Sequence, residues 1–287
     1  MRHVAYLLAR HGYLERIESS PPSTTSTAPT PPPCAEILGI PLAISHYEEV
    51  LDWMQALIAA DRRGYVTAAA VNLVMKAQEE PATLQATLGA TLAVPDGQPL
   101  VWALHALGHP RATRVYGPDL MAHFCARAAR EDIPMYLYGG RDAPARELLE
   151  RRLRERFPGI RIVGGNSPPF RPLTVEEDER ALADIEASGA QVVWVGTGQP
   201  LQEQWMLRVR PLLSAPLLVG VGAAFDFHAG LVSQAPPWMQ RHGLEWVYRL
   251  SREPRRLWPR YARYNPRFVA GFARQYARHR RGQRGDK

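Results

Sequence analysis

Residues 191–198 read QVVWVGTG, and the chain continues at 200–213 with PLQEQWMLRVRPLL. The first segment is short, apolar and rich in β-branched residues, which is typical of a strand buried on both faces. The second has the length and apolar spacing of an amphipathic helix. A buried strand that passes through a glycine-containing turn into a helix is the repeating unit of a parallel α/β sheet.

The same alternation continues on both sides of this unit. Further strands are expected at 66–71, 134–140, 160–165 and 216–227. Helices are expected at about 74–88, 98–107, 118–131, 143–156 and 175–188, and an earlier helix is expected to start at a capping box of Ser45 and Glu48. The sequence therefore predicts an α/β fold with a Rossmann-like, mostly parallel sheet and helices on both faces.

The two ends of the chain differ from this central part. Residues 19–33 are almost entirely Ser, Thr and Pro, so we predict that 1–34 is a disordered N-terminal extension. The α/β domain should span 35–244, and 245–287 should form a basic, amphipathic helical appendage. Residues 241–287 hold 14 Lys and Arg against three acidic residues, whereas the rest of the chain has a net charge of −4.

Composition excludes several other classes of protein. A chain of 287 residues with 46% hydrophobic residues is globular. The two cysteines, Cys34 and Cys125, have no metal-site or disulfide spacing, which favours free thiols in a reducing compartment. No apolar run approaches the roughly 18 residues of a membrane-spanning helix, and no signal peptide is evident. We therefore expect a cytoplasmic protein without a metal or another cofactor.

Ligands of parallel sheets bind beyond the carboxyl ends of the strands. Glycine at these positions lets a ligand approach the backbone, and the following helix N-termini favour anions, so a bound diphosphate is expected. Glycine is also common in such turns for structural reasons alone, so a single glycine pair decides little. The candidate positions are Asn72, Gly139, Gly140, Gly196, Gly198, Gln199 and Asp226.

Five sequence blocks occur in a distinctive order: VPDGQPLVW, RVYGPDL, GTGQPLQEQW, GVGAAFDFHAG and GLEWVYRLSREPRR. With these blocks the sequence resembles the WecG/TagA/CpsF glycosyltransferases (glycosyltransferase family 26) over about residues 35–265. The resemblance implies an inverting, metal-independent enzyme of cell-surface polysaccharide synthesis. It would move a hexose or N-acetylhexosamine from a UDP-sugar donor to an undecaprenyl-diphosphate-linked acceptor at the cytoplasmic membrane face.

Asp96, in the PDG turn, is the candidate general base. Inverting transfer needs a group that removes the proton of the acceptor hydroxyl, and a positioned carboxylate can do so. The resemblance implies the same role for Asp96. An Asp-Gly turn is also common, and Asp96 could instead cap the following helix.

The charge of the leaving UDP must be met by cations or amides, because the chain has no Asp-x-Asp pair. Arginine suits a diphosphate by its fork geometry. Arg114, Arg249 and Arg256 match arginines of the family. Arg114 could alternatively be a surface charge at the start of a loop.

Three further polar positions carry family-implied roles. Gln202 and Glu203, in QPLQEQW, could bind sugar, uracil or ribose, or could simply be a polar first helical turn. Asn72 would contact the sugar or the acceptor, and Asp226 either faces the ligand or fixes a loop. The chain departs from the family pattern at Ala70, Leu201, Gln234-Ala235-Pro236, Pro168-Pro169-Phe170 and Pro259, which bears on the identity of the donor and acceptor.

A helix started by Pro266 would place rings and arginines on separate faces. The rings are those of Phe268, Phe272 and Tyr276, and the arginines are Arg267, Arg274, Arg278 and Arg281. This pattern is typical of an interfacial anchor on an anionic membrane, where each basic residue contributes about 1 kcal/mol. An ordinary helix packed on the domain is the alternative.

Two other functions fit parts of the sequence. Arginine interleaved with aromatic rings also suits single-stranded nucleic acid, although the charge is confined to the tail and we expect no nucleic-acid partner. GTGQPL and GVGAAF each lack the last glycine of a dinucleotide-binding fingerprint, which disfavours a nicotinamide enzyme. Homo-oligomerisation is possible on this sequence, and the donor sugar and the acceptor glycan are not specified by it.

Overall fold

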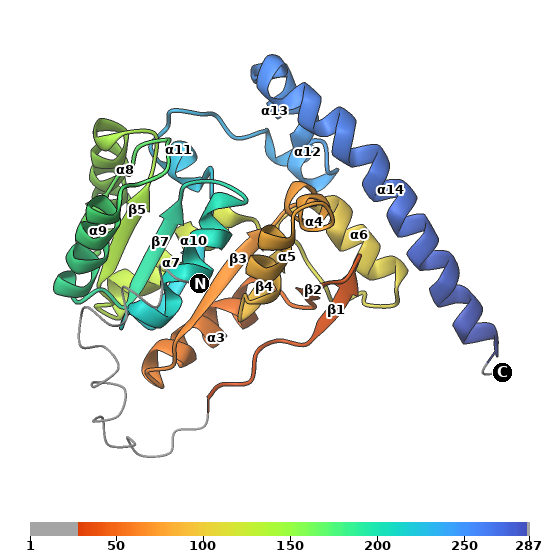
Figure 1. Cartoon of the computed structure of the whole chain (residues 1–287), viewed down its shortest axis with the longest axis horizontal. Coiled ribbons are helices and arrows are strands. Elements are labelled where there is room, and N and C mark those ends of the chain that lie inside the picture. Colours follow the sequence, from red (N-terminus) through yellow and green to blue (C-terminus); the bar gives the residue numbers. More distant parts are fainter. Residues whose placement is uncertain (1–27, 286–287) are drawn as a thin grey trace.

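The computed structural model describes residues 28–285, apart from the side chains at 237, 256 and 283–285. Its centre is a six-stranded parallel sheet with the strand order β4-β3-β8-β7-β5-β6 (Figure 1). The strands are β3 (Gly64–Ala69), β4 (Leu92–Pro95), β5 (Met135–Gly139), β6 (Ile162–Asn166), β7 (Val192–Gly196) and β8 (Leu217–Gly220).

Helices cover both faces of this sheet because successive residues of a strand point to opposite faces. Val192 and Trp194 of β7 belong to the core beneath one set of helices, and Val193 and Val195 belong to the core beneath the other. The first set is α3 (Tyr47–Ala59), α7 (Gly117–Arg130), α8 (Ala143–Arg156) and α11 (Ala224–His228); the second is α9 (Val175–Ser188) and α10 (Leu201–Val209), which continues into a short 3-10 turn (Arg210–Leu212). The predicted fold is confirmed.

A third apolar cluster lies beside the β4 edge of the sheet. It joins an antiparallel hairpin, β1 (Cys34–Ile37) and β2 (Ile40–Ala43), to α4 (Val71–Ala77), α6 (Gln98–Ala106) and the C-terminal helix α14 (Pro254–Gly285). Helix α5 (Pro81–Leu88) packs beside α4 and α10. This cluster attaches the end of the chain to the domain.

Several predicted boundaries were wrong. Strand β4 was missed because its four residues, LAVP, are too few to show a pattern and end in proline. The apolar run 216–227 is a strand only to Gly220, and its second half turns into α11. The predicted helix at 74–88 is two helices, because Pro81 starts α5.

The predicted capping box at the start of α3 was also wrong. The N-cap is His46, whose Nδ1 accepts a hydrogen bond from the Glu49 N–H at 3.4 Å. Ser45 is buried, and its carbonyl accepts from the Thr113 N–H and hydroxyl. Because Ser45 is held by the loop at residue 113, the helix begins one residue later than expected.

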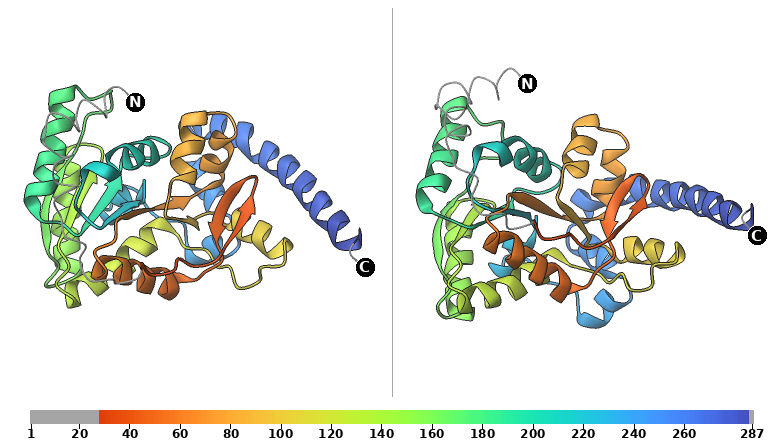
Figure 2. Two further views of the ribbon diagram at one scale, coloured as in Figure 1. Left: turned by 60° about the horizontal axis from the view of Figure 1, so that its bottom comes forward. Right: turned by 90° about the horizontal axis from the view of Figure 1, so that it is seen from below.

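The predicted appendage at 245–287 consists of α13 (Glu245–Arg252) and α14, which follow the short helix α12 (Pro237–Arg241). Helix α14 leaves the body of the molecule at its far end (Figures 1 and 2). Helix α14 starts at Pro254, not Pro266, and passes through both Pro259 and Pro266. The predicted separation of rings and arginines is confirmed, because Phe268, Phe272 and Tyr276 stack one after another along the helix while the predicted arginines are exposed. Tyr264 and Phe268 are buried against the domain.

The N-terminal extension lies mostly outside the described residues, at 1–27. Within the described part, the Pro29 carbonyl accepts a hydrogen bond from the Trp53 indole at 3.2 Å, and the Pro33 carbonyl accepts from the Ile44 N–H at 2.7 Å. Cys34 already belongs to β1 and is a free thiol, as is the buried Cys125. The chain is therefore ordered on the domain before residue 35.

Candidate active site

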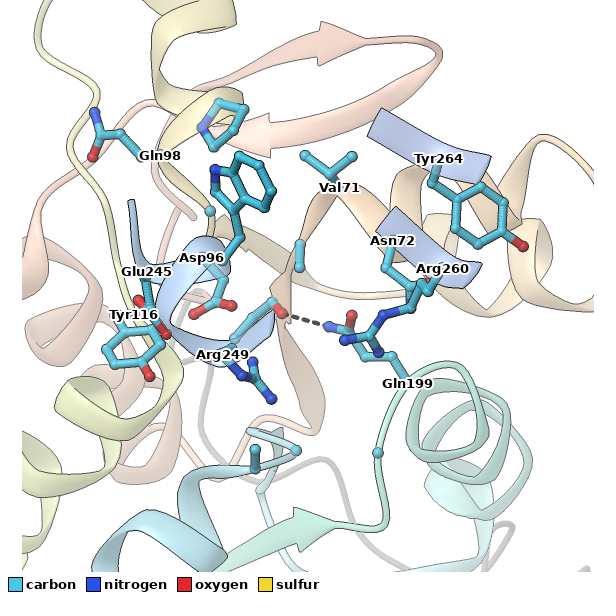
Figure 3. Close-up of a pocket in the computed structure, with 18 of the residues that line it drawn as sticks. Val71, Asn72, Asp96, Gln98, Tyr116, Gln199, Glu245, Arg249, Arg260 and Tyr264 are labelled. Carbon is cyan, nitrogen blue, oxygen red and sulfur yellow. Dashed lines mark hydrogen bonds between the residues drawn. The ribbon is translucent and has the colours of Figure 1, made fainter. Parts of the chain in front are cut away.

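A cavity of about 850 Å³ lies at the carboxyl ends of β3, β4, β7 and β8, and α13 and α14 form one of its walls (Figure 3). Parallel strands bring their carboxyl ends to one edge of the sheet, so residues far apart in the sequence meet here. Of the predicted site residues, this cavity is lined by Asn72, Asp96, Arg114, Gly140, Gly196, Gly198, Gln199, Asp226 and Arg249.

Asp96 follows β4 directly and is held from three directions. Its N–H donates to the Ala69 carbonyl at 2.8 Å, and its carbonyl accepts from Arg114 Nε at 2.5 Å. One carboxylate oxygen, Oδ1, accepts from the Gly117 N–H at 2.8 Å. Asp96 therefore does not cap α6; it is tied to the start of α7, and no described residue donates to its other oxygen.

The surroundings of Asp96 change its proton affinity. Burial raises the pKa of its carboxyl to about 6, an effect that the Arg114 charge and the Gly117 N–H oppose and that Glu245 reinforces. The carboxylate is still ionised at neutral pH, yet it holds a proton more tightly than an ordinary aspartate. That combination suits a general base.

Arg114 is not a surface charge. Its Nη2 donates to Glu245 Oε2 at 2.5 Å, and its guanidinium lies 4.1 Å from the centre of the Tyr116 ring. Both members of this ion pair are largely buried. Since Glu245 is the first residue of α13, the pair fastens the appendage to the loop that holds Asp96.

Three other guanidinium groups line the cavity. Arg249 comes from α13; its Nε is buried and has no hydrogen-bond partner among the described residues. Arg260 comes from α14, one residue after the position where the family pattern places an arginine. Arg141 follows β5, and its Nε donates to Asp226 Oδ1 at 3.0 Å. The side chain of Arg256 lies outside the described part of the chain.

The glycine-lined side of the cavity is formed by the ends of β5 and β7. A Cβ at Gly139 would lie 2.6 Å from the carbonyl carbon of Gly196, so Gly139 serves packing and does not reach the cavity. Gly198 has φ +85 and no atom near its Cβ position, so its backbone is open to a ligand. Gln199 Nε2 donates to the Ala68 carbonyl at 2.6 Å (Figure 3). Thr197 Oγ1 is buried with no described partner.

Asn72 lies in the first turn of α4 and also lines the cavity. Its Oδ1 is likewise buried and has no hydrogen-bond partner among the described residues. Buried polar atoms are normally paired, so unpaired ones that line a cavity mark positions where a ligand completes the network.

The structure does not bring Gln202 and Glu203 to the cavity. Both are fully buried, and Glu203 Oε1 accepts from Thr67 Oγ1 at 2.6 Å and from Gln202 Nε2 at 2.8 Å. Gln202 Oε1 in turn accepts from the Gly222 N–H at 3.0 Å. Through the Gly222 N–H they hold the loop after β8 in place. Direct contact with ribose or sugar would therefore require a different arrangement of α10.

Sequence reasoning missed two charged lining residues, Arg141 and Glu245. Each had a local signal, because Arg141 follows a strand-end glycine pair and Glu245 opens the block EWVYRL. Within residues 28–285, no three His, Cys, Asp or Glu side chains gather as metal ligands do.

The arrangement can bind an anion between guanidinium groups and strand-end amides while a weakly basic carboxylate faces the same space. Such an arrangement suits a transfer reaction in which negative charge develops on the leaving group. The sequence model of the Glycosyl transferase WecG/TagA/CpsF family matches residues 35–282. The match covers nearly all of the chain, and the chain belongs to this glycosyltransferase family.

Proposed function

We propose that the protein is an inverting, metal-independent glycosyltransferase. It moves a hexose or N-acetylhexosamine from a UDP-sugar to an undecaprenyl-diphosphate-linked acceptor in cell-surface polysaccharide synthesis. The family supports glycosyl transfer, and the donor, the acceptor and the mechanism are our proposal. The observation that carries it is the Asp96 carboxylate, which lines the cavity with one oxygen held by the Gly117 N–H and the other receiving no hydrogen bond from the described residues.

This geometry supports the following reaction. Asp96 takes the proton of the acceptor hydroxyl as its oxygen attacks the anomeric carbon of the donor sugar. The bond between that carbon and the UDP oxygen breaks on the opposite face, so configuration inverts. The pair of electrons leaves with UDP, whose added negative charge the cavity's guanidinium groups stabilise.

The leaving group is expected to lie near Arg249 and Arg141. Arg249 has a buried Nε with no hydrogen-bond partner in the part of the chain that the structure describes, and Arg141 is half exposed beside the strand-end glycines. Arg114 is committed to Glu245 and to the Asp96 carbonyl, so its role is positioning. Fork-shaped guanidinium groups bind diphosphate oxygens in pairs, which lets them replace a metal ion.

The direct test is a donor screen with a short-chain prenyl-diphosphate-linked acceptor. Asp96→Asn should lower kcat by about 100-fold to 10,000-fold, the usual contribution of a general base. Asp226→Asn is the matched control, because it removes a second carboxylate of the same cavity that is paired with Arg141. Full turnover in Asp96→Asn with loss in Asp226→Asn would transfer the base role to Asp226.

The appendage is expected to bind an anionic membrane surface reversibly. Helix α14 carries exposed arginines at Arg274, Arg278 and Arg281, and Trp238, Trp246 and Trp258 are exposed upstream of them. No described helix is both long and apolar enough to cross a bilayer. The rings of Tyr264 and Phe268 are buried, which argues against stacking on nucleic-acid bases.

Liposome co-sedimentation tests this surface. Changing Arg274, Arg278 and Arg281 to glutamate should abolish binding to anionic vesicles. The control changes Arg62, Arg63 and Arg130 to glutamate, which alters the net charge equally with exposed residues far from the cavity edge of the sheet. Equal loss in both variants would indicate a response to net charge and no specific surface.

A further inference from the structure

The cavity extends well beyond the reaction centre, and its outer part is apolar. One wall follows α6 from Pro99 to Trp102, and the other follows α14 from Arg260 to Tyr276. At 1.5 Å per residue, the α14 wall is about 24 Å long. We call the outer part the α6–α14 groove; it lies between Pro99 and Trp102 on one side and Val269, Phe272, Ala273 and Tyr276 on the other.

Helix α14 has three stripes, and the groove uses the second. The first stripe packs on the domain through Tyr264, Phe268 and Gln275, whose side chain hydrogen-bonds backbone groups of the β1–β2 hairpin at 2.7 and 2.9 Å. The second stripe contains the groove residues of α14, which are apolar apart from the Tyr276 hydroxyl. The third stripe is basic and carries Arg274, Arg278 and Arg281.

Large apolar side chains face this groove without being covered. Trp102 is 52% exposed and Val269 is 65% exposed, and they stand on opposite walls. The Trp102 indole is held in place, because it fills the space beside Gly243, where a Cβ would lie 2.8 Å from the ring. Apolar surface that is exposed, rigid and continuous with a reaction centre marks a ligand contact.

We propose that the α6–α14 groove binds the first isoprene units of the acceptor's polyprenyl chain. The inference rests on the proposed function and adds a binding site for the lipid part of the acceptor. One cavity holds a side chain for each part of such an acceptor: Asp96 for the sugar hydroxyl, Arg260 for the diphosphate, and the apolar walls for the chain. The donor nucleotide then occupies the glycine-lined side, over Gly140 and Gly198.

The test compares two acceptors with the same sugar diphosphate, one carrying a dimethylallyl chain and one a farnesyl chain, in solution without membranes. The wild-type enzyme should have a kcat/KM about tenfold or more higher for the farnesyl acceptor, because more hydrocarbon is buried. In Val269→Glu and Ala273→Glu this ratio should fall toward one. A ratio is used because it does not depend on how much of the variant is active.

The matched control is Arg274→Glu with Arg278→Glu, which changes the basic stripe of the same helix. It should weaken vesicle binding and keep the chain-length ratio. A wild-type ratio near one, or an unchanged ratio in the groove variants, would overturn the inference while leaving glycosyl transfer intact. A photoreactive farnesyl diphosphate analogue gives a readout that needs no turnover: it should label α6 and α14, and labelling confined to other elements would also overturn it.

If no acceptor of either chain length is glycosylated, the proposed function fails. In that case the photolabelling still shows whether the groove binds a prenyl chain, since it reports binding alone. If phospholipid vesicles suppress the labelling of α6 and α14 and prenyl diphosphates do not, the groove binds a phospholipid acyl chain. That result would overturn the inference.

Discussion

Replacing Asp96 with asparagine should remove catalysis and should also remove a pH dependence from the stability of the protein. The cavity holds the Asp96 carboxyl at a pKa of about 6, against 3.8 for the unperturbed group. A raised pKa means that the folded state prefers the protonated form. The native state is therefore disfavoured wherever the carboxyl must be ionised.

The magnitude follows from this shift. A difference of about two pKa units corresponds to about 3 kcal/mol, at 1.36 kcal/mol per unit. The favourable contribution of protonated Asp96 is fully present below about pH 4 and is lost as the pH rises through 6. Asparagine does not titrate and keeps an acceptor for the Gly117 N–H. The stability of Asp96→Asn relative to wild type should thus rise by about 3 kcal/mol between pH 4 and pH 8.

Urea unfolding of both proteins at several pH values measures this difference. Any constant effect of the amide cancels, because only the change with pH is interpreted. Glu177→Gln is a control that should not change with pH over most of this range: Arg171 lowers the pKa of the exposed Glu177 from 4.5 to about 2, so its contribution is lost only at lower pH. A stability difference for Asp96→Asn that stays constant from pH 4 to 8 would refute the account of Asp96.

Three further predictions concern other contacts. Glu245→Gln removes a charge that raises the Asp96 pKa, so the acid limb of the kcat/KM profile should move below pH 6. Gly139→Ala should cost about 2 kcal/mol or more in urea unfolding, because φ is +129 and the new Cβ would meet the β7 backbone. Arg208→Met leaves the buried Asp178 carboxylate without its ion pair and should cost about 3 kcal/mol in the same assay.

Each of these has a contrasting outcome. An unchanged acid limb in Glu245→Gln would mean that the charge of Glu245 does not influence the pKa of Asp96. Gly282→Ala, where nothing lies near the new Cβ, should be neutral or slightly stabilising, so equal losses at positions 139 and 282 would contradict the packing argument. Adding Asp178→Leu to Arg208→Met should recover stability, and a further loss would mean that the pair is not the cause.

The sheet was readable from the sequence because buried parallel strands are continuous apolar runs between helices. The exceptions have local causes. Strand β4 is an edge strand of four residues, and α14 passes through Pro259 and Pro266, where proline rules predict a break. Both prolines are exposed, so water can solvate the carbonyls that lose their helical donors.

The site was readable only in part, since the strand-end rule gives positions and not the direction of side chains. Asp96 and Asn72 follow strands and line the cavity. Gln202 and Glu203 occupy an equally suggestive place at the start of a helix, yet they turn inward because Thr67 and Gly222 offer buried partners. Thr67 belongs to β3, far before Glu203 in the sequence, and Gly222 follows β8, the next strand after Gln202. No local sequence pattern therefore identifies either partner.

The two readings of the C-terminal helix, packed element or membrane anchor, are compatible in this fold. In a helix with only one aromatic and one basic face, the aromatic side chains could pack against the domain or insert into the bilayer, but not both. Because α14 has three stripes, Tyr264 and Phe268 fix it to the domain while Arg274, Arg278 and Arg281 remain at the surface. The apolar stripe between them then leads from that surface to the cavity, which is the path a membrane-held acceptor would need to reach Asp96.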